Sequence, residues 1–86
     1  MRRFVNDSTF WEIDYIPDIN EIIIHTGHIN KKGVITMIYE GYDGDKGYQS
    51  MEVKINNKRS EKYTEVPAIN NKYKLYDYYT TINKLI

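Results

Sequence analysis

The sequence has no cysteine, and this absence excludes disulfide bonds and thiolate metal sites. Its apolar residues are scattered, and no run approaches the length of about 20 residues that a membrane-spanning helix needs. The opening residues, 1–4, are not followed by an apolar stretch, so a secretory signal is not predicted. We therefore expect a cytoplasmic protein without a membrane partner.

Residue combinations that carry catalysis are also scarce. The chain has no Gly-rich phosphate loop and no serine-centred nucleophile motif. Its two histidines, His25 and His28, are three positions apart, and such residues on a strand point to opposite faces and cannot readily hold one ion. Asp43 and Asp45 resemble part of a calcium loop, but the remaining ligands lack the required spacing. We expect no enzymatic activity, no cofactor and no metal.

Net charge is zero, but the charges are unevenly spread. Residues 1–50 hold five basic and eight acidic residues, whereas residues 51–86 hold seven basic and four acidic residues. A dedicated nucleic-acid binder usually has a larger basic excess over the whole domain. The distribution still permits a basic face in the second half of the chain.

What the chain does have is tyrosine: nine, against two phenylalanines and one tryptophan in 86 residues. A chain of this length forms one domain with a thin core. Four tyrosines fall within seven residues of the tail, and neither a helix nor a strand points all four the same way. Either some of them face outward as a binding surface, or their rings lie flat on a sheet edge and enlarge the core. The four are Tyr73, Tyr76, Tyr78 and Tyr79.

Alternation with a period of two predicts strands in the first half of the chain. In residues 10–16, Trp11, Ile13 and Tyr15 share one face, which indicates a structural role for Trp11 in the core. Residues 17–20 form a turn, and residues 21–29 form a strand rich in isoleucine. Residues 30–33 supply hairpin chemistry, and residues 34–42 return as the next strand.

The period changes to helical spacing after the Asp43–Gly47 break. Tyr48, Met51 and Ile55 predict a helix over about residues 46–60, with basic residues near its end as the helix dipole prefers. Residues 63–66 form a short extended segment. Residues 68–86 fit a short helix by spacing and a strand by propensity. These elements predict an α+β fold: a small antiparallel sheet with one helix packed across a face, plus a C-terminal extension.

The stretch from about Asn6 to Val66 resembles a WGR domain, a module named for its Trp-Gly-Arg signature. The strand Phe10–Ile13 is similar to the aromatic-aromatic-acidic-aliphatic opening of the family. Gly27 matches the central glycine of the signature, and Gly33 matches the glycine of the following hairpin. Lys58 and the pair Lys62–Tyr63 are similar to the lysine and the Gly-Tyr pair that close the family helix. The resemblance implies a WGR-like domain at 1–66, with 67–86 as a tyrosine-rich extension packed on it.

The sequence also departs from the WGR pattern. Thr26 and His28 stand where the signature has Trp and Arg, residues tied to DNA-end and interdomain contacts in poly(ADP-ribose) polymerases. Asn30 and Lys62 stand where glycines are usual. The resemblance therefore carries over to the fold more directly than to the function.

Two hypotheses of function follow. The first is a non-enzymatic module that binds a protein partner, or a second copy, through the tyrosine-rich surface, as an adaptor, inhibitor or self-associating unit. The second is a module that binds DNA or RNA through a basic helix face, formed by Lys54, Lys58, Arg59 and Lys62. A spacing of four residues places the three lysines on one helix edge. There they either contact successive phosphates along a nucleic-acid strand or face solvent without a ligand. Arg2, Arg3, Lys31 and Lys32 are candidates to extend this face.

Overall fold

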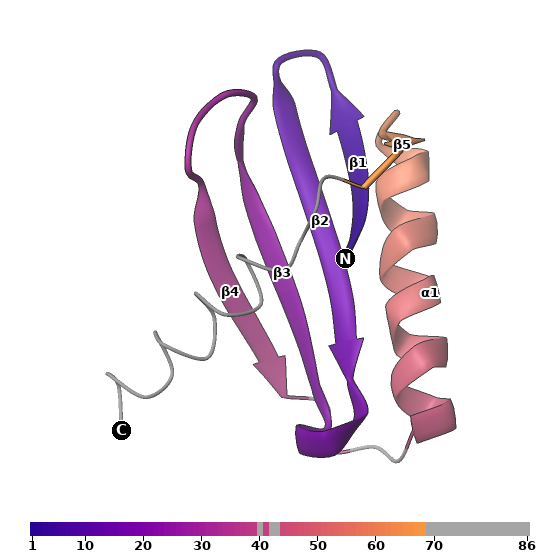
Figure 1. Cartoon of the computed structure of the whole chain (residues 1–86). Coiled ribbons are helices and arrows are strands. Elements are labelled where there is room, and N and C mark those ends of the chain that lie inside the picture. Colours follow the sequence, from indigo (N-terminus) through magenta and orange to yellow (C-terminus); the bar gives the residue numbers. More distant parts are fainter. Residues whose placement is uncertain (40, 42–43, 69–86) are drawn as a thin grey trace.

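One antiparallel sheet and one long helix make up the part of the chain that the computed structural model describes, residues 1–39, 41 and 44–68 (Figure 1). The sheet has the strand order β4-β3-β2-β1-β5, and every neighbouring pair is antiparallel. The elements are β1 (Arg2–Asn6), β2 (Thr9–Ile16), a 3-10 helix (Pro17–Ile19), β3 (Glu21–His28), β4 (Val34–Tyr39), α1 (Gly44–Ser60) and β5 (Thr64–Val66).

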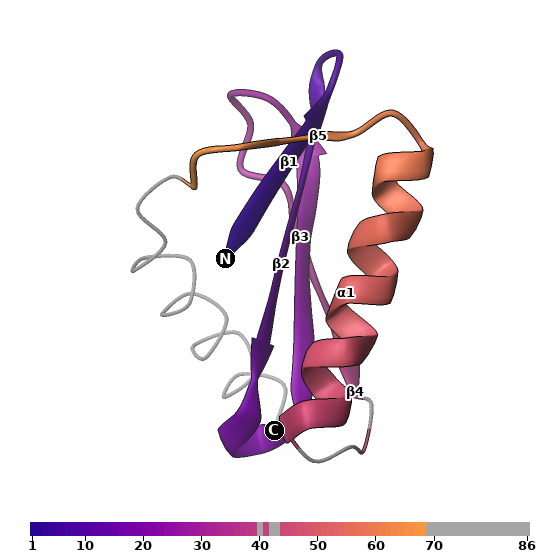
Figure 2. The same ribbon diagram turned by 90° about the vertical axis from the view of Figure 1, so that its right-hand side faces the viewer.

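The predicted α+β class is confirmed, and the helix crosses one face of the sheet (Figure 2). After β4, at one edge, the chain forms α1 and then returns as β5 at the opposite edge. Sequence analysis did not predict β1, which pairs with both β2 and β5 in the sheet. Among the described residues, no helix is both long and apolar enough to span a membrane.

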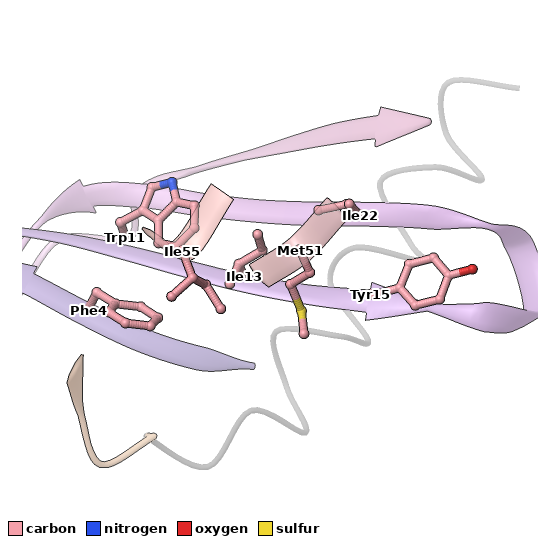
Figure 3. Close-up of a cluster of buried hydrophobic side chains, with 7 residues drawn as sticks. All are labelled: Phe4, Trp11, Ile13, Tyr15, Ile22, Met51 and Ile55. Carbon is pink, nitrogen blue, oxygen red and sulfur yellow. The ribbon is translucent and has the colours of Figure 1, made fainter. Parts of the chain in front are cut away.

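The core lies between α1 and the sheet (Figure 3). As predicted, Trp11, Ile13 and Tyr15 share the face that α1 covers, and all three are buried. Met51 and Ile55 reach this face from the helix, one turn apart. Phe4 packs edge-on against Trp11, with ring centroids 5.6 Å apart, so the unpredicted β1 supplies a core residue. The buried members of the core are Phe4, Trp11, Ile13, Tyr15, Ile22, Met51 and Ile55.

The opposite face of β2 is buried as well. Glu12 and Phe10 are 0% and 3% exposed, although they alternate with the core residues. A second cluster of buried residues, Ile16 and Ile23, lies on this face with Met1 and Ile35 packed against it. The sheet therefore carries apolar residues on both sides.

The hairpin between β3 and β4 depends on close backbone contact. Gly33 has φ +76°, as the predicted turn requires, and Asn30 has φ +70°. A Cβ added at Gly27 would lie 2.7 Å from the Gly33 Cα, so only a residue without a side chain allows this approach. A Cβ at either glycine would also lie within 3.3 Å of the Phe10 ring, so the hairpin loop packs closely against β2.

Candidate functional site

The predicted basic face lies at the C-terminal end of α1, but the helix does not carry all of it. Lys54, Lys58 and Arg59 lie on α1, which ends at Ser60. Lys62 lies two residues beyond the helix and has φ +71°. The expected ladder of three lysines on one helix edge is therefore interrupted, because α1 ends at Ser60 and the backbone is left-handed at Lys62.

Lys62 occupies the left-handed position of a Schellman-type helix end. The Tyr63 amide donates to the Lys58 carbonyl oxygen at 3.1 Å, and the Lys62 amide donates to the Arg59 carbonyl oxygen at 3.0 Å. A position of this kind favours glycine, because a Cβ is crowded in left-handed backbone. The WGR pattern has glycine at this position and at Asn30, which are two of the four non-glycine residues with positive φ in the described part; the other two are Asp7 and Asn20.

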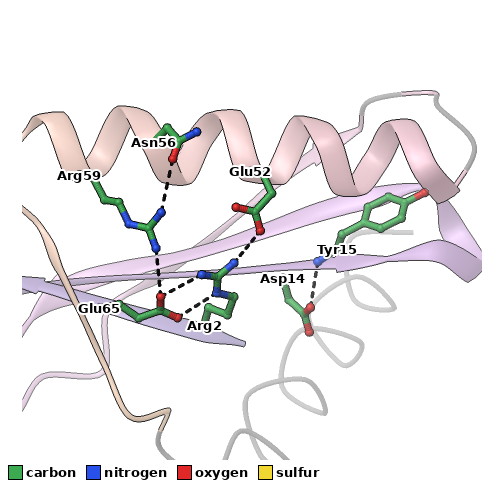
Figure 4. Close-up of polar contacts among 7 residues, drawn as sticks. All are labelled: Arg2, Asp14, Tyr15, Glu52, Asn56, Arg59 and Glu65. Carbon is green, nitrogen blue, oxygen red and sulfur yellow. Dashed lines mark hydrogen bonds and ion pairs between the residues drawn. The ribbon is translucent and has the colours of Figure 1, made fainter.

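Arg59 belongs to an ion-pair network that joins α1 to the two strands at one edge (Figure 4). Arg2 donates two hydrogen bonds of 2.9 Å to the two carboxylate oxygens of Glu65, and a third of 2.6 Å to Glu52. Arg59 donates to the same Glu65 carboxylate at 3.3 Å and to Asn56 at 3.4 Å. Its guanidinium also lies 5.8 Å from the centre of the Phe4 ring. The network connects β1, β5 and α1.

The charges of this network shift the ionisation of its members. The hydrogen bonds from Arg2 hold the pKa of the Glu65 carboxyl below its usual value, and the positive charges of Arg2 and Arg59 act in the same direction against burial. In return, the hydrogen bond to Glu65 raises the pKa of the Arg2 guanidinium. Both shifts favour the charged forms of Arg2 and Glu65.

The ammonium group of Lys58 lies near aromatic rings of the fold. This group lies 5.1 Å from the centre of the Tyr63 ring and 5.7 Å from that of Trp11, within the range of cation–π attraction. It also pairs with Glu61 at 3.4 Å. Lys54 donates to the Ser50 hydroxyl at 3.4 Å. Lys58 and Arg59 therefore serve the packing and charge balance of α1.

A buried polar cluster that sequence analysis did not predict lies on the sheet face opposite α1. Glu12 is fully buried and accepts a hydrogen bond of 3.1 Å from Arg3. Its other oxygen lies 2.8 Å from His25 Nδ1, and His25 Nε2 donates to the Lys32 carbonyl oxygen at 2.6 Å. The Phe10 ring packs beside His25 and beneath the Arg3 guanidinium. The cluster joins three strands and the hairpin loop, and its burial indicates a structural role.

The two histidines are separated as the sequence predicted. His25 is buried beside Glu12, whereas His28 is exposed at the end of β3. Within the described ranges, no group of three or more His, Cys, Asp or Glu side chains is arranged to hold a metal ion. Asp43 of the calcium-like turn lies outside the described residues.

An aromatic surface lies where the first turn of α1 meets β2. Tyr48 is 48% exposed, and its ring packs edge-on against Tyr15 with centroids 4.9 Å apart. The Tyr15 hydroxyl donates to Asn20 at 2.9 Å, which fixes the ring from its other end. Gly47 makes this contact possible, since a Cβ there would lie 2.1 Å from the Tyr15 Cζ. Tyr48 is thus held in place while half of its surface faces outward.

The tyrosines that the sequence placed in a partner-binding surface lie outside the described residues. They are Tyr73, Tyr76, Tyr78 and Tyr79. The exposed large apolar side chains within the described part are Ile19, Val34, Tyr48 and Val53.

Comparison of the chain with models of known families, with curated proteins and with solved structures finds no match.

Proposed function

We propose that the chain is a non-enzymatic module that binds a protein partner, as an adaptor, an inhibitor or a self-associating unit. One observation carries the proposal: the side chains of Lys58 and Arg59 on α1 are engaged by carboxylates and rings of the same chain. The described part also exposes large apolar and aromatic side chains, among them Tyr48 and Val53. A surface of this composition suits a protein partner better than a polyanion.

Tyr48 provides the described part of this surface. Its ring is braced by Tyr15, so it loses little conformational freedom when a partner covers it. Tyrosine is enriched among the residues that contribute most to protein–protein affinity. The tail cluster, Tyr73, Tyr76, Tyr78 and Tyr79, extends the proposal on the sequence argument alone.

Affinity capture with the full chain tests this function. Extracts are treated with nuclease beforehand, so that nucleic acid cannot bridge the chain to other proteins. We expect the wild type to capture a defined protein or a second copy of itself. A variant with the four tail tyrosines replaced by serine, and separately Tyr48→Ser, should lose capture while circular dichroism shows an intact fold. Capture that both variants retain would refute the tyrosine surface.

The matched comparison replaces the cations of α1 instead. A variant with glutamine at the four basic positions should capture the same protein as the wild type. Loss of capture in this variant alone would move the binding surface to the C-terminal end of α1. The four positions are Lys54, Lys58, Arg59 and Lys62.

The alternative function is nucleic-acid binding, and one observation favours it. Asn30 and Lys62 adopt left-handed backbone at positions where the WGR pattern has glycine, which favours the resemblance to a family that contacts DNA, although Thr26 and His28 replace the residues tied to those contacts. The glutamine variant tests this function too, because each lost phosphate contact lowers the salt slope of binding by about 0.7–0.9. Tight, salt-dependent binding by the wild type, with a smaller slope in the variant, would support the alternative.

A further inference from the structure

The two edges of the sheet differ in their protection against pairing with another strand. β5 has three residues, Thr64–Val66, is followed by Pro67, and has Glu65 at its centre. Short length, proline and charge are the features with which natural proteins protect sheet edges. β4 has six residues, Val34–Tyr39, with neither charge nor proline among them. Among the described residues, β4 pairs only with β3.

Side chains of β4 are also open to solvent on the face that carries α1. Val34 is 68% exposed and Thr36 is exposed, and they pair with Thr26 and Ile24 of β3. The helix packs over β2 and β3 and leaves this part of β4 uncovered. A further strand along β4 would satisfy its outer backbone groups and bury part of these side chains.

We propose that the occupant of this edge is β4 of a second copy of the chain, paired antiparallel about a twofold axis through the middle of the strand. With the axis at Thr36, residues 34–38 of the two copies face one another and Tyr39 faces Gly33, so no like charges meet within the ladder. A twofold interface must be complementary to itself, and an uncharged strand rich in β-branched residues meets this condition.

Charges beside the strand are complementary in the same arrangement. Lys31 and Lys32 are exposed just before β4 begins. Glu21 pairs with Tyr39 at the end of β4, and Asp45 is exposed in the first turn of α1, soon after that end. Antiparallel pairing brings the basic start of one strand beside the acidic end of the other. Complementary charges of this kind fix the register and direction of association.

This inference rests on the proposed function in that a second copy is a partner, and it goes beyond that function in placing the contact between copies at β4, separate from the tyrosine surface. Sedimentation velocity of the full chain over a range of concentrations tests it. The wild type should shift from the mass of one chain to that of two. Thr36→Lys places a charge on the exposed edge and should raise the dissociation constant of the dimer by about tenfold or more.

Val53→Lys is the matched control, because it adds the same charge at an exposed apolar position of α1, away from the proposed edge. It should sediment as the wild type does. A further experiment with opposite charges at residue 36 distinguishes loss of the dimer contact from misfolding of the variant. Residues 36 of the two copies lie on one face of the joined sheet within about 5–8 Å of each other in either central register. Mixing Thr36→Lys with Thr36→Glu should therefore restore the dimer that neither forms alone.

Four results would overturn the inference: a wild type that stays at the mass of one chain, a dimer that Thr36→Lys leaves unchanged, equal weakening by Val53→Lys, or a mixture that does not restore the dimer. Its failure is distinguishable from failure of the proposed function. A chain of monomer mass that still captures a different protein through its tyrosines contradicts only the β4 pairing.

Discussion

Arg2 and Glu65 lie near opposite ends of the described chain and are joined by two parallel hydrogen bonds, each 2.9 Å long. This two-pronged pairing is the most specific geometry available between an arginine and a carboxylate. Arg59 of α1 donates to the same carboxylate, so the short strand β5 is held by charge as well as by its backbone pairing with β1. Arg59, which the sequence suggests as a contact to nucleic acid, therefore stabilises the attachment of β5.

Replacing Glu65 with glutamine should make stability less dependent on acid pH. The pKa of Glu65 is lowered in the folded chain, so its contribution is present at neutral pH. This contribution is lost as pH falls from the ordinary carboxyl value of 4.5 through the lower folded value. Because the pair is partly exposed, we expect a loss below about 1 kcal/mol at pH 7.

Urea unfolding of wild type and Glu65→Gln at pH 7 and at pH 3 measures this difference. Glu61→Gln is the control, since Glu61 is more exposed and meets only Lys58, at 3.4 Å, among the ion pairs of the described chain. The stability gap between wild type and Glu65→Gln should narrow at the lower pH. A gap that widens would show that the pKa shift has the opposite direction.

Gly47→Ala should destabilise the chain, because the added Cβ would lie 2.1 Å from the Tyr15 ring. Either the ring or the helix must move, at a cost of about 1–3 kcal/mol for overpacking, which exceeds the gain in helix propensity of about 1 kcal/mol. Gly44→Ala provides the control, since nothing lies within 4 Å of a Cβ at that position. Thermal melts that rank Gly47→Ala at or above Gly44→Ala would contradict the packing of Tyr15 against α1.

Lys62→Gly should stabilise the chain by about 1 kcal/mol, because Lys62 has φ +71° and glycine adopts this backbone without a Cβ clash. Lys62→Ala removes the same amine but keeps a Cβ, so its stability should stay close to that of the wild type. Chemical denaturation of the three proteins separates the two effects. Equal stabilisation by alanine and glycine would assign the gain to the lost charge instead.

Several features of the fold were predictable because they rest on local patterns. The period of two in Trp11, Ile13 and Tyr15 located the core face, and the spacing of Met51 and Ile55 located the helix face. Tyr48 shares that spacing but is half exposed, because Gly47 instead sits against the sheet. Helical periodicity counts apolar side chains, so it cannot predict that Gly47 packs against the Tyr15 ring.

Other features depend on contacts between residues that are distant in the sequence. Strand β1 begins with two arginines, which in the sequence look like charges exposed to solvent. In the structure Arg2 pairs with Glu65 and Arg3 pairs with Glu12. Glu12 is fully buried because Arg3 and His25 meet it from neighbouring strands. Alternation shows which face of the sheet a residue is on, but it cannot show whether an oppositely charged side chain lies beside it there.

The cations at the C-terminal end of α1 are expected to stabilise the fold rather than to bind a nucleic acid. Lys58 lies near the rings of Trp11 and Tyr63, and Arg59 pairs with Glu65. Replacing the four basic residues by glutamine should therefore lower stability, by about 1–2 kcal/mol from lost cation–π and ion-pair contacts. The four are Lys54, Lys58, Arg59 and Lys62.

Urea unfolding combined with oligonucleotide titration tests this expectation, with a control in which the exposed residues Lys31, Lys32 and Lys46 are replaced by glutamine. The free energy of unfolding of each protein is measured in urea. A separate, folded sample of each protein is titrated into labelled single- and double-stranded DNA and RNA at low salt. We expect the four-glutamine variant of α1 to be less stable than the wild type, the control to keep wild-type stability, and none of the three proteins to bind an oligonucleotide tightly. Tight binding by the wild type that the α1 variant alone loses, at unchanged stability, would contradict this expectation.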